Sequence, residues 1–265
     1  MKAQLRHAYQ TGKLVLFAGA GVSANLGLPS WSQLTSRFDN ELGYDLEIIA
    51  SYGNHLALAE FYSKKKGTLG PLRSWMDREW HREGIDIGGS EIHRLIAQGN
   101  FSKIYTTNYD RWLEIAHDYY GIPYTKVASV ADLVTAQEGC REIVKFHGDF
   151  DDDASIVLDE TSYYERLDFE SPLDIKLRHD VLGNSVLFIG YSISDLNIRL
   201  LFYRLTKMWG NHARAPARPK SYLFTNRPNP VAEEVLGHWG IEMLVSEEDD
   251  RQTALTEFLA ELVQR

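Results

Sequence analysis

The sequence has a single cysteine, Cys140, among its 265 residues. One cysteine can form neither an intramolecular disulfide nor a zinc site of the Cys-x-x-Cys type. Apolar runs are also short. None reaches the roughly 18 residues that a membrane-spanning helix needs, and the polar N-terminus lacks the apolar core of a signal peptide. These absences predict a protein of the reducing cytoplasm that has no membrane partner.

Basic residues are in the minority, because 28 Lys and Arg stand against 37 Asp and Glu, which gives a net charge of −9. Lys and Arg on phosphates drive nonspecific binding to nucleic acids. The charge therefore argues against a chain that holds DNA or RNA by itself. The apolar content of 44% is that of an ordinary globular protein, and the length suits one large domain, residues 1–265.

Short apolar runs alternate with segments of helical periodicity, which predicts an α/β fold with a Rossmann-like parallel sheet and helices on both faces. Residues 44–89 break the alternation, since they contain helix-like pieces and no convincing strand. We interpret them as a helical insertion subdomain within the domain. The predicted strands cover residues 14–18, 103–106, 143–146, 185–189, 221–225 and 241–245.

The first predicted strand runs directly into GAGVSANLGLP, which begins at Gly19. Gly19, Gly21 and Ala24 satisfy the loose Gly-x-Gly-x-x-Gly/Ala pattern of dinucleotide-binding loops, in which glycines let a phosphate approach the backbone. An ordinary tight turn would use the same residues. No Lys-Ser/Thr pair follows, which argues against a P-loop.

Polar residues also follow three later strands. They occur in YTTNYD (105–110), KFHGD (145–149) and LFIGYSISD (187–195). The carboxyl ends of parallel strands meet at the edge of the sheet where α/β proteins bind ligands. We expect these segments to form one site with the glycine-rich loop.

These motifs, in this order, resemble those of the sirtuin family, and specifically its bacterial NAD⁺ hydrolases of antiphage defence. GAGVSANLGLP is similar to the sirtuin glycine loop, TTNYD to the motif with the catalytic asparagine, and FHGD to the motif with the catalytic histidine. The resemblance implies that Asn108 and His147 are catalytic. It implies that NAD⁺ contacts Gly19, Ala20, Gly21, Ser23, Asp110, Gly190, Ser192, Asp195 and Asn226.

Departures from the deacylating sirtuins favour the hydrolase branch. The four cysteines of their zinc module are missing, Ser30-Trp31-Ser32 replaces their Asp-Phe-Arg, and the segment after His147 is acidic. The expected reaction is cleavage of NAD⁺ to nicotinamide and ADP-ribose, with no metal required. A protein deacylase and a non-catalytic module that senses NAD⁺ or ADP-ribose are the alternatives.

Several residues also have simpler interpretations. Asp110 is placed to cap the helix that follows it, and Ser23 to cap a helix, to bind phosphate, or to do both. The acidic run that starts at Asp149 suggests either a metal site or, in better agreement with the expected reaction, a solvated loop.

The resemblance further implies a defence effector that depletes NAD⁺ on infection. Such an enzyme has to be held inactive in a healthy cell. We therefore expect control by a homo-oligomer, by a protein partner such as a ring-forming DNA-translocase ATPase, or by both.

Overall fold

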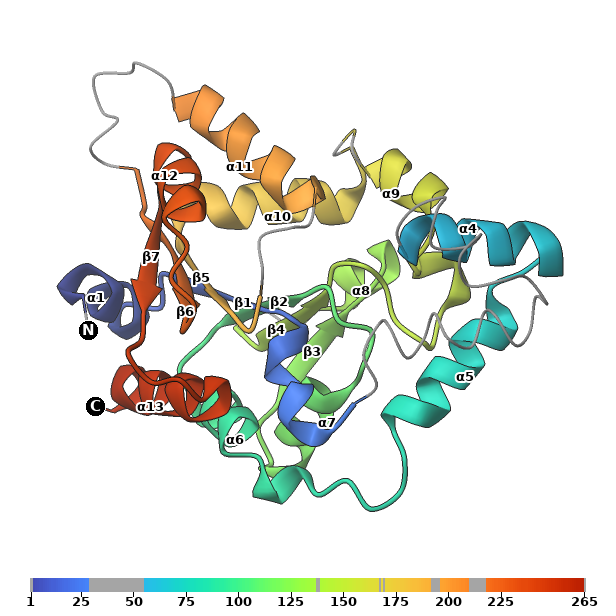
Figure 1. Cartoon of the computed structure of the whole chain (residues 1–265), viewed down its shortest axis with the longest axis horizontal. Coiled ribbons are helices and arrows are strands. Elements are labelled where there is room, and N and C mark those ends of the chain that lie inside the picture. The colour runs from blue at the N-terminus through green and yellow to red at the C-terminus, as the bar shows by residue number, and fades with distance from the viewer. Residues whose placement is uncertain are drawn as a thin grey trace.

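The computed structural model describes residues 2–28, 55–136, 139–166, 168, 170–191, 196–209 and 218–264. Within them, seven strands form one sheet in the order β3-β4-β2-β1-β5-β6-β7, and every pair of neighbours is parallel (Figure 1). The predicted fold class is confirmed. The strands are β1 (Leu14–Ala18), β2 (Lys103–Thr106), β3 (Tyr124–Val127), β4 (Arg141–Lys145), β5 (Ser185–Ile189), β6 (Ser221–Thr225) and β7 (Ile241–Val245).

Helices connect the strands, as parallel pairing requires. No helix in the described part of the chain combines the length and the apolar character needed to cross a membrane. The helices are α1 (Ala3–Gln10), α4 (His55–Lys66), α5 (Gly70–Trp80), α6 (Glu91–Gln98), α7 (Trp112–Tyr119), α8 (Val130–Thr135), α9 (Glu160–Arg166), α10 (Pro172–Gly183), α11 (Leu196–Trp209), α12 (Pro230–His238) and α13 (Arg251–Val263), and the 3₁₀ turns are η1 (Ala20–Val22), η2 (Ala24–Leu26), η3 (Ile87–Gly89) and η4 (Asp153–Ser155).

Both faces of the sheet are buried. Along β1, Leu14 and Leu16 pack into a cluster with α1, α6 and α13, while Val15 and Phe17 pack into a second cluster with α10, α11 and α12. Figure 1 shows these two groups of helices on opposite sides of the sheet. Because successive side chains of a strand point to opposite faces, a strand buried on both faces has a continuous apolar run. This explains why β1 and β5 could be located from sequence.

The sheet has a topological switch point between β1 and β5. From β1 the chain continues to β2 on one side, and it later enters β5 on the other side. Loops that leave the carboxyl ends of strands at such a point diverge and leave a crevice where ligands bind. The glycine-rich loop and the loop of Gly190 are the two that leave this point.

The strand β3 was missed by the sequence prediction, and β4 starts two residues earlier than predicted. Tyr124–Val127 lies at an edge of the sheet and is mostly half-buried. It contains Thr125 and Lys126 instead of an apolar run. The strand is defined by its pairing with β4, which also recruits the polar residues Arg141 and Glu142. Pairing of this kind leaves no trace in the hydrophobic pattern.

The described part of the predicted helical insertion consists of α4, α5 and η3, and residues 44–54 lie outside the described residues. Tyr62 of α4 and Met76 of α5 form a small apolar cluster that also contains Tyr109 and Phe150, from the segments after β2 and β4. The two helices are thus packed on the strand ends that carry the candidate site. Their status as a subdomain remains a prediction.

Candidate active site

The glycine-rich loop fits tightly against the loop after β5. A Cβ atom at Gly21 would lie 2.7 Å from the Gly190 carbonyl oxygen, and one at Gly190 would lie 2.5 Å from the Val22 nitrogen. Gly190 also has a φ of +57°, which other residues rarely adopt. These glycines are therefore needed to bring the two loops together at the switch point.

The same contact uses most of the loop's backbone N–H groups. Gly19 N donates to Ile189 O (3.0 Å) and Gly21 N to Gly190 O (2.7 Å). Val22 N and Ser23 N donate within the loop, to Gly19 O and Ala20 O. Between Gly19 and Ser23, only the Ala20 N–H donates to no carbonyl of the described residues. The loop thus offers fewer free amides to an anion than its glycine pattern predicts.

Ser23 joins the glycine-rich loop to the segment after β2. Its hydroxyl donates to Asp110 Oδ1 at 3.1 Å, and both residues are buried. The same carboxylate oxygen accepts the Trp112 backbone N–H at 3.2 Å, at the start of α7. The N-cap of α7 is Arg111, so Asp110 is not the predicted cap but accepts the first N–H of the helix from one residue earlier, and it also orients Ser23. In this arrangement the Ser23 proton is not directed at a phosphate.

Thr106, at the end of β2, positions Asn108. Its hydroxyl donates to Ala18 O at 2.8 Å and accepts the Asn108 backbone N–H at 3.0 Å. Asn108, two residues beyond the end of β2, is half-buried. Sequence reasoning missed this role of Thr106, although the residue belongs to the quoted TTNYD motif.

His147 follows the neighbouring strand at the matching position. Thr106 pairs in register with Lys145, so Asn108 and His147 each lie two residues beyond a pair of aligned residues. Phe146 N donates to Thr106 O at 2.8 Å, which extends the pairing one residue further. Only 2% of His147 is exposed. Its ring packs edge-on against Tyr163, with the ring centroids 5.2 Å apart.

An arginine from α9 holds the backbone just before His147. Arg166 donates to Phe146 O at 2.9 Å and to Asp174 Oδ1 at 2.7 Å. Its guanidinium also lies over the Phe146 ring, 4.4 Å from the centroid. A guanidinium that makes two hydrogen bonds and stacks on a ring is held firmly in place. Arg166 therefore supports the His147 segment from outside the sheet, in addition to the strand pairing within it.

A buried ion pair lies beneath the two strand ends. The Lys145 side chain is fully buried, and its Nζ contacts the backbone oxygens of Tyr109 and Asp110 and lies 3.3 Å from Glu114 Oε1. Burial raises the pKa of the Glu114 carboxyl, and the nearby positive charge of Lys145 opposes this rise. Lys145 thereby ties the strand that leads to His147 to the segment that carries Asn108. Sequence reasoning missed this link, because it treated KFHGD mainly as the context of the histidine.

The acidic segment after His147 differs partly from the predicted solvated loop. Asp151, Asp152 and Asp153 are exposed, as expected, but Asp149 is 1% exposed. Its Oδ2 lies 3.4 Å from Lys126 Nζ, and its Oδ1 accepts the Asp151 N–H. The difference arises because β3, the strand missing from the prediction, supplies Lys126. The described residues contain no group of three or more His, Cys, Asp and Glu side chains placed to hold a metal ion.

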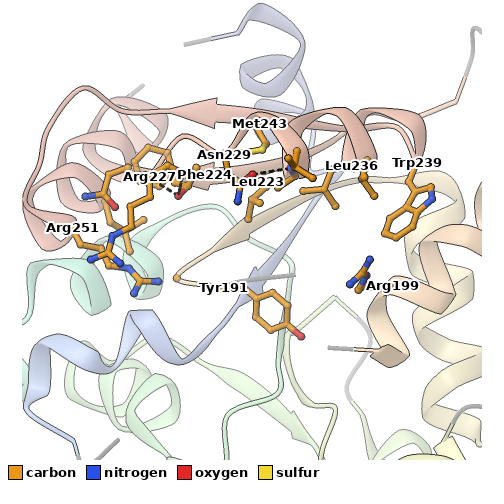
Figure 2. A pocket seen from close by; sticks show the side chains of 17 residues that line it. Tyr191, Arg199, Leu223, Phe224, Arg227, Asn229, Leu236, Trp239, Met243 and Arg251 are labelled. Atoms are coloured by element: carbon orange, nitrogen blue, oxygen red, sulfur yellow. Dashed lines mark hydrogen bonds between the residues drawn. The ribbon is translucent and has the colours of Figure 1, made fainter. Parts of the chain in front are cut away.

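A pocket of about 520 Å³ opens on the other side of the switch point, next to β6 and α12 (Figure 2). Asn226 lines it, and the Asn226 amide donates to Asp249 O at 2.7 Å, just before α13. Gly190 also lines it. The expected contacts Ser192 and Asp195 lie outside the described residues. The remaining lining residues are Tyr191, Arg199, Leu223, Phe224, Thr225, Arg227, Asn229, Val231, Ala232, Val235, Leu236, Trp239, Met243, Arg251 and Leu255.

The described residues of the expected site thus fall into two groups. Ser23, Asp110, Asn108 and His147 follow β1, β2 and β4, where hydrogen bonds and strand register hold them together. Asn226 forms the second group; it follows β6 and lines the pocket on the other side of the switch point. Gly19, Ala20, Gly21 and Gly190 form the junction between the groups.

Comparison with known proteins agrees with this architecture. A family model described as the SIR2-like domain matches residues 102–244, from the start of β2 to β7. An NAD(+) hydrolase ThsA from Enterococcus faecium is 31% identical over 195 residues, which cover 72% of this chain and 39% of the relative. A ThsA from Bacillus cereus is 27% identical over 201 residues, or 75% of this chain and 41% of the relative.

Defense-associated sirtuin 2 from Bacillus subtilis is 27% identical over 241 residues, which cover 88% of this chain and 23% of the relative. The chain therefore spans less than half the length of each of these curated relatives. The family match covers more than half of the chain and includes Asn108, His147, Gly190 and Asn226. Together with the parallel sheet and the site at its switch point, this match establishes that the chain belongs to the SIR2-like family.

Proposed function

We propose that this protein is an NAD⁺ hydrolase that cleaves the bond between nicotinamide and ribose and releases nicotinamide and ADP-ribose. The observation that carries the proposal is the placement of Asn108 and His147 on the ends of two adjoining parallel strands, beside the glycine-rich loop at the switch point. The names of the ThsA relatives support the choice of substrate and reaction.

The proposed reaction uses few groups because the leaving group is already activated. The bond between nicotinamide nitrogen and ribose C1′ breaks, and nicotinamide leaves as a neutral molecule with the bonding electrons. Positive charge develops on the ribose, as in other glycosidic cleavages. A water oxygen then bonds to C1′ and loses a proton. No step in this scheme requires a metal.

In this scheme the Asn108 amide orients the nicotinamide ribose and the attacking water, and His147 accepts the proton. An imidazole suits this role, since histidine ordinarily titrates close to neutral pH. Asp110, two residues after Asn108, and Ser23, which bonds to Asp110, would complete the ribose end of the site. Gly190 and Asn226 would contact the adenosine half of NAD⁺ from the pocket. The contacts assigned to Ser192 and Asp195 belong to the same proposal.

We also propose that the enzyme serves in antiphage defence and is controlled by assembly, either with copies of itself or with a ring-forming DNA-translocase ATPase. The name Defense-associated sirtuin 2 supports the defence role. The net charge of −9 is in keeping with a chain that leaves contact with DNA to a partner. An isolated monomer with full activity, whose rate no partner changes, would contradict control by assembly.

The test of the proposed function is NAD⁺ consumption by the purified chain, with the products separated by chromatography. We expect His147→Ala and Asn108→Ala each to lower kcat by about 100-fold or more, the usual contribution of a positioned acid–base group. Asn100→Ala and His179→Ala are matched controls, because both residues are exposed and lie outside the site.

Cleavage that survives both active-site substitutions would reject the residue assignment while keeping the activity. NAD⁺-dependent removal of an acyl group from a lysine peptide would replace the hydrolase with a deacylase. Binding of NAD⁺ or ADP-ribose without turnover, both alone and with a partner, would indicate a sensing module.

A further inference from the structure

We propose that Arg251 binds the pyrophosphate of the dinucleotide and supplies the positive charge that the glycine-rich loop does not. The ligand follows from the proposed function, on which this inference rests. The choice of Arg251, however, rests on the structure alone. Arg251 is the first residue of α13, more than 200 residues from the loop in sequence, and no motif pointed to it.

The need for such a residue arises from the hydrogen bonds of the loop. Phosphate bound at a glycine-rich turn is usually held by free backbone N–H groups. Here four of the five N–H groups from Gly19 to Ser23 already donate to carbonyl oxygens of the protein. The Ser23 hydroxyl donates to Asp110. Among these five amides, only that of Ala20 has no carbonyl partner within the described residues, so a pyrophosphate at the glycines would find few free donors there.

Arg251 lies directly against this loop. One of its guanidinium nitrogens, Nη2, is 2.8 Å from the position that a Cβ atom at Gly21 would occupy. A side chain at position 21 would therefore displace the guanidinium. Arg251 also lines the pocket together with Gly190 and Asn226. In Figure 2 its side chain lies at the same end of the pocket as that of Arg227.

The guanidinium is available to an anion. Within the described residues no carboxylate pairs with Arg251 or Arg227, and both residues are exposed. Two of the four acidic side chains just before Arg251 accept hydrogen bonds from neighbouring residues. Glu248 accepts the Asp250 N–H at 2.8 Å, and Asp250 accepts the Thr253 N–H and hydroxyl at the start of α13. Two cations at one end of a pocket, with no carboxylate partner among the described residues, favour a phosphate ligand.

A guanidinium is also the appropriate group for this ligand. Its planar donors match phosphate oxygens in a two-point contact that a point charge cannot make. The Asp250 cap fixes the first turn of α13, which limits the motion of the backbone that carries Arg251. The side chain would therefore bridge the pocket and the glycine-rich loop where the pyrophosphate connects the two halves of NAD⁺.

The experiment compares the binding of ADP-ribose, which contains the pyrophosphate, with that of adenosine, which contains no phosphate. Both are titrated by calorimetry into the full chain as wild type, Arg251→Gln and Arg251→Lys. We expect Arg251→Gln to weaken ADP-ribose binding by roughly 10- to 100-fold, as for a lost hydrogen bond to a charged group. Adenosine binding and the urea midpoint should stay unchanged. Arg251→Lys should recover only part of the loss.

Arg78→Gln, on the exposed surface of α5, is the control for the change in net charge. Unchanged ADP-ribose binding in Arg251→Gln would overturn the inference, and so would an equal loss of adenosine binding. If the wild type binds ADP-ribose through Arg251 but does not cleave NAD⁺, the proposed function fails and this inference stands. If the chain cleaves NAD⁺ with the same KM in wild type and Arg251→Gln, the inference alone fails.

Discussion

The polar side chains on the two sides of the switch point differ in their burial and in their partners within the protein. On the side of β2 and β4, polar side chains such as Thr106, Lys145 and Asp149 are buried and have partners within the protein. On the side of β5 and β6, the pocket is lined largely by apolar residues, and its three arginines, Arg199, Arg227 and Arg251, are exposed.

In the proposed enzyme, this difference would correspond to a division between the reacting groups and the groups that bind the rest of the dinucleotide. A reacting centre gains from groups whose positions are fixed before the substrate arrives, because small misplacements cost large factors in rate. Cations that bind a phosphate have to remain accessible until the ligand replaces their water. The contact between Gly21 and Gly190 joins the two sides, and in the proposed enzyme it would place a ligand held at the pocket beside the reacting groups.

The largest expected effect comes from breaking the buried ion pair. Lys145→Met leaves the Glu114 carboxyl buried without its positive neighbour, and we expect a loss of about 3–5 kcal/mol in the free energy of unfolding. Urea denaturation measures this loss. A second substitution, Glu114→Leu, should restore part of it, because an apolar pair can replace a buried ion pair.

Lys64→Met is the matched control, since the Lys64 side chain is 74% exposed in its pair with Glu60. Its effect should stay within about 0.5 kcal/mol. If Lys145→Met were equally mild, the buried polar groups beside β2 and β4 would not be the stabilising framework described above.

Lowering the pH is expected to have a smaller effect on the free energy of unfolding. His93 and His117 are fully buried on the β2 side, and burial lowers the pKa of each to about 4. In the unfolded chain both titrate near 6.5. Between these values the unfolded state binds more protons, so stability is highest above pH 6.5 and falls as the pH drops toward 4.

At pH 5 the loss amounts to about 2 kcal/mol for each histidine. Urea denaturation at pH 7 and pH 5 measures it. His93→Gln should remove about half of the difference between the two pH values, whereas His179→Gln, at an exposed position of α10, should leave it intact. An unchanged difference in His93→Gln would show that the buried histidine is not responsible.

The smallest effect tests the support of Asn108. Thr106→Val keeps the shape of the side chain but removes its bonds to Ala18 O and Asn108 N, at a cost of about 1 kcal/mol in stability. In the proposed enzyme kcat should fall several-fold while KM changes little, because Thr106 positions Asn108 and does not bind NAD⁺. Thr256→Val is the control, since its hydroxyl makes the same kind of bond on the exposed surface of α13. A fall in stability without a fall in kcat would reduce Thr106 to a structural role.

The sequence by itself determined the α/β class and most of the sheet. The strands β1, β2, β5, β6 and β7 were predicted with the residues they have in the structure. The signal is clearest in β1 and β5, because strands covered by helices on both faces need apolar residues throughout. The order of the motifs also identified the family, to which the chain belongs. These features depend on local patterns, which a sequence displays directly.

The tertiary structure alone decided which groups meet. The edge strand β3, the pairing of Lys126 with Asp149, the burial of Lys145 beside Glu114 and the approach of Arg251 to Gly21 all join distant segments. The sequence shows that a lysine or an arginine is present but not whether it will be paired in the interior or left exposed at a pocket. That outcome depends on the packing of the whole sheet and its helices, because burial and charge compensation are properties of the assembled environment rather than of the residue.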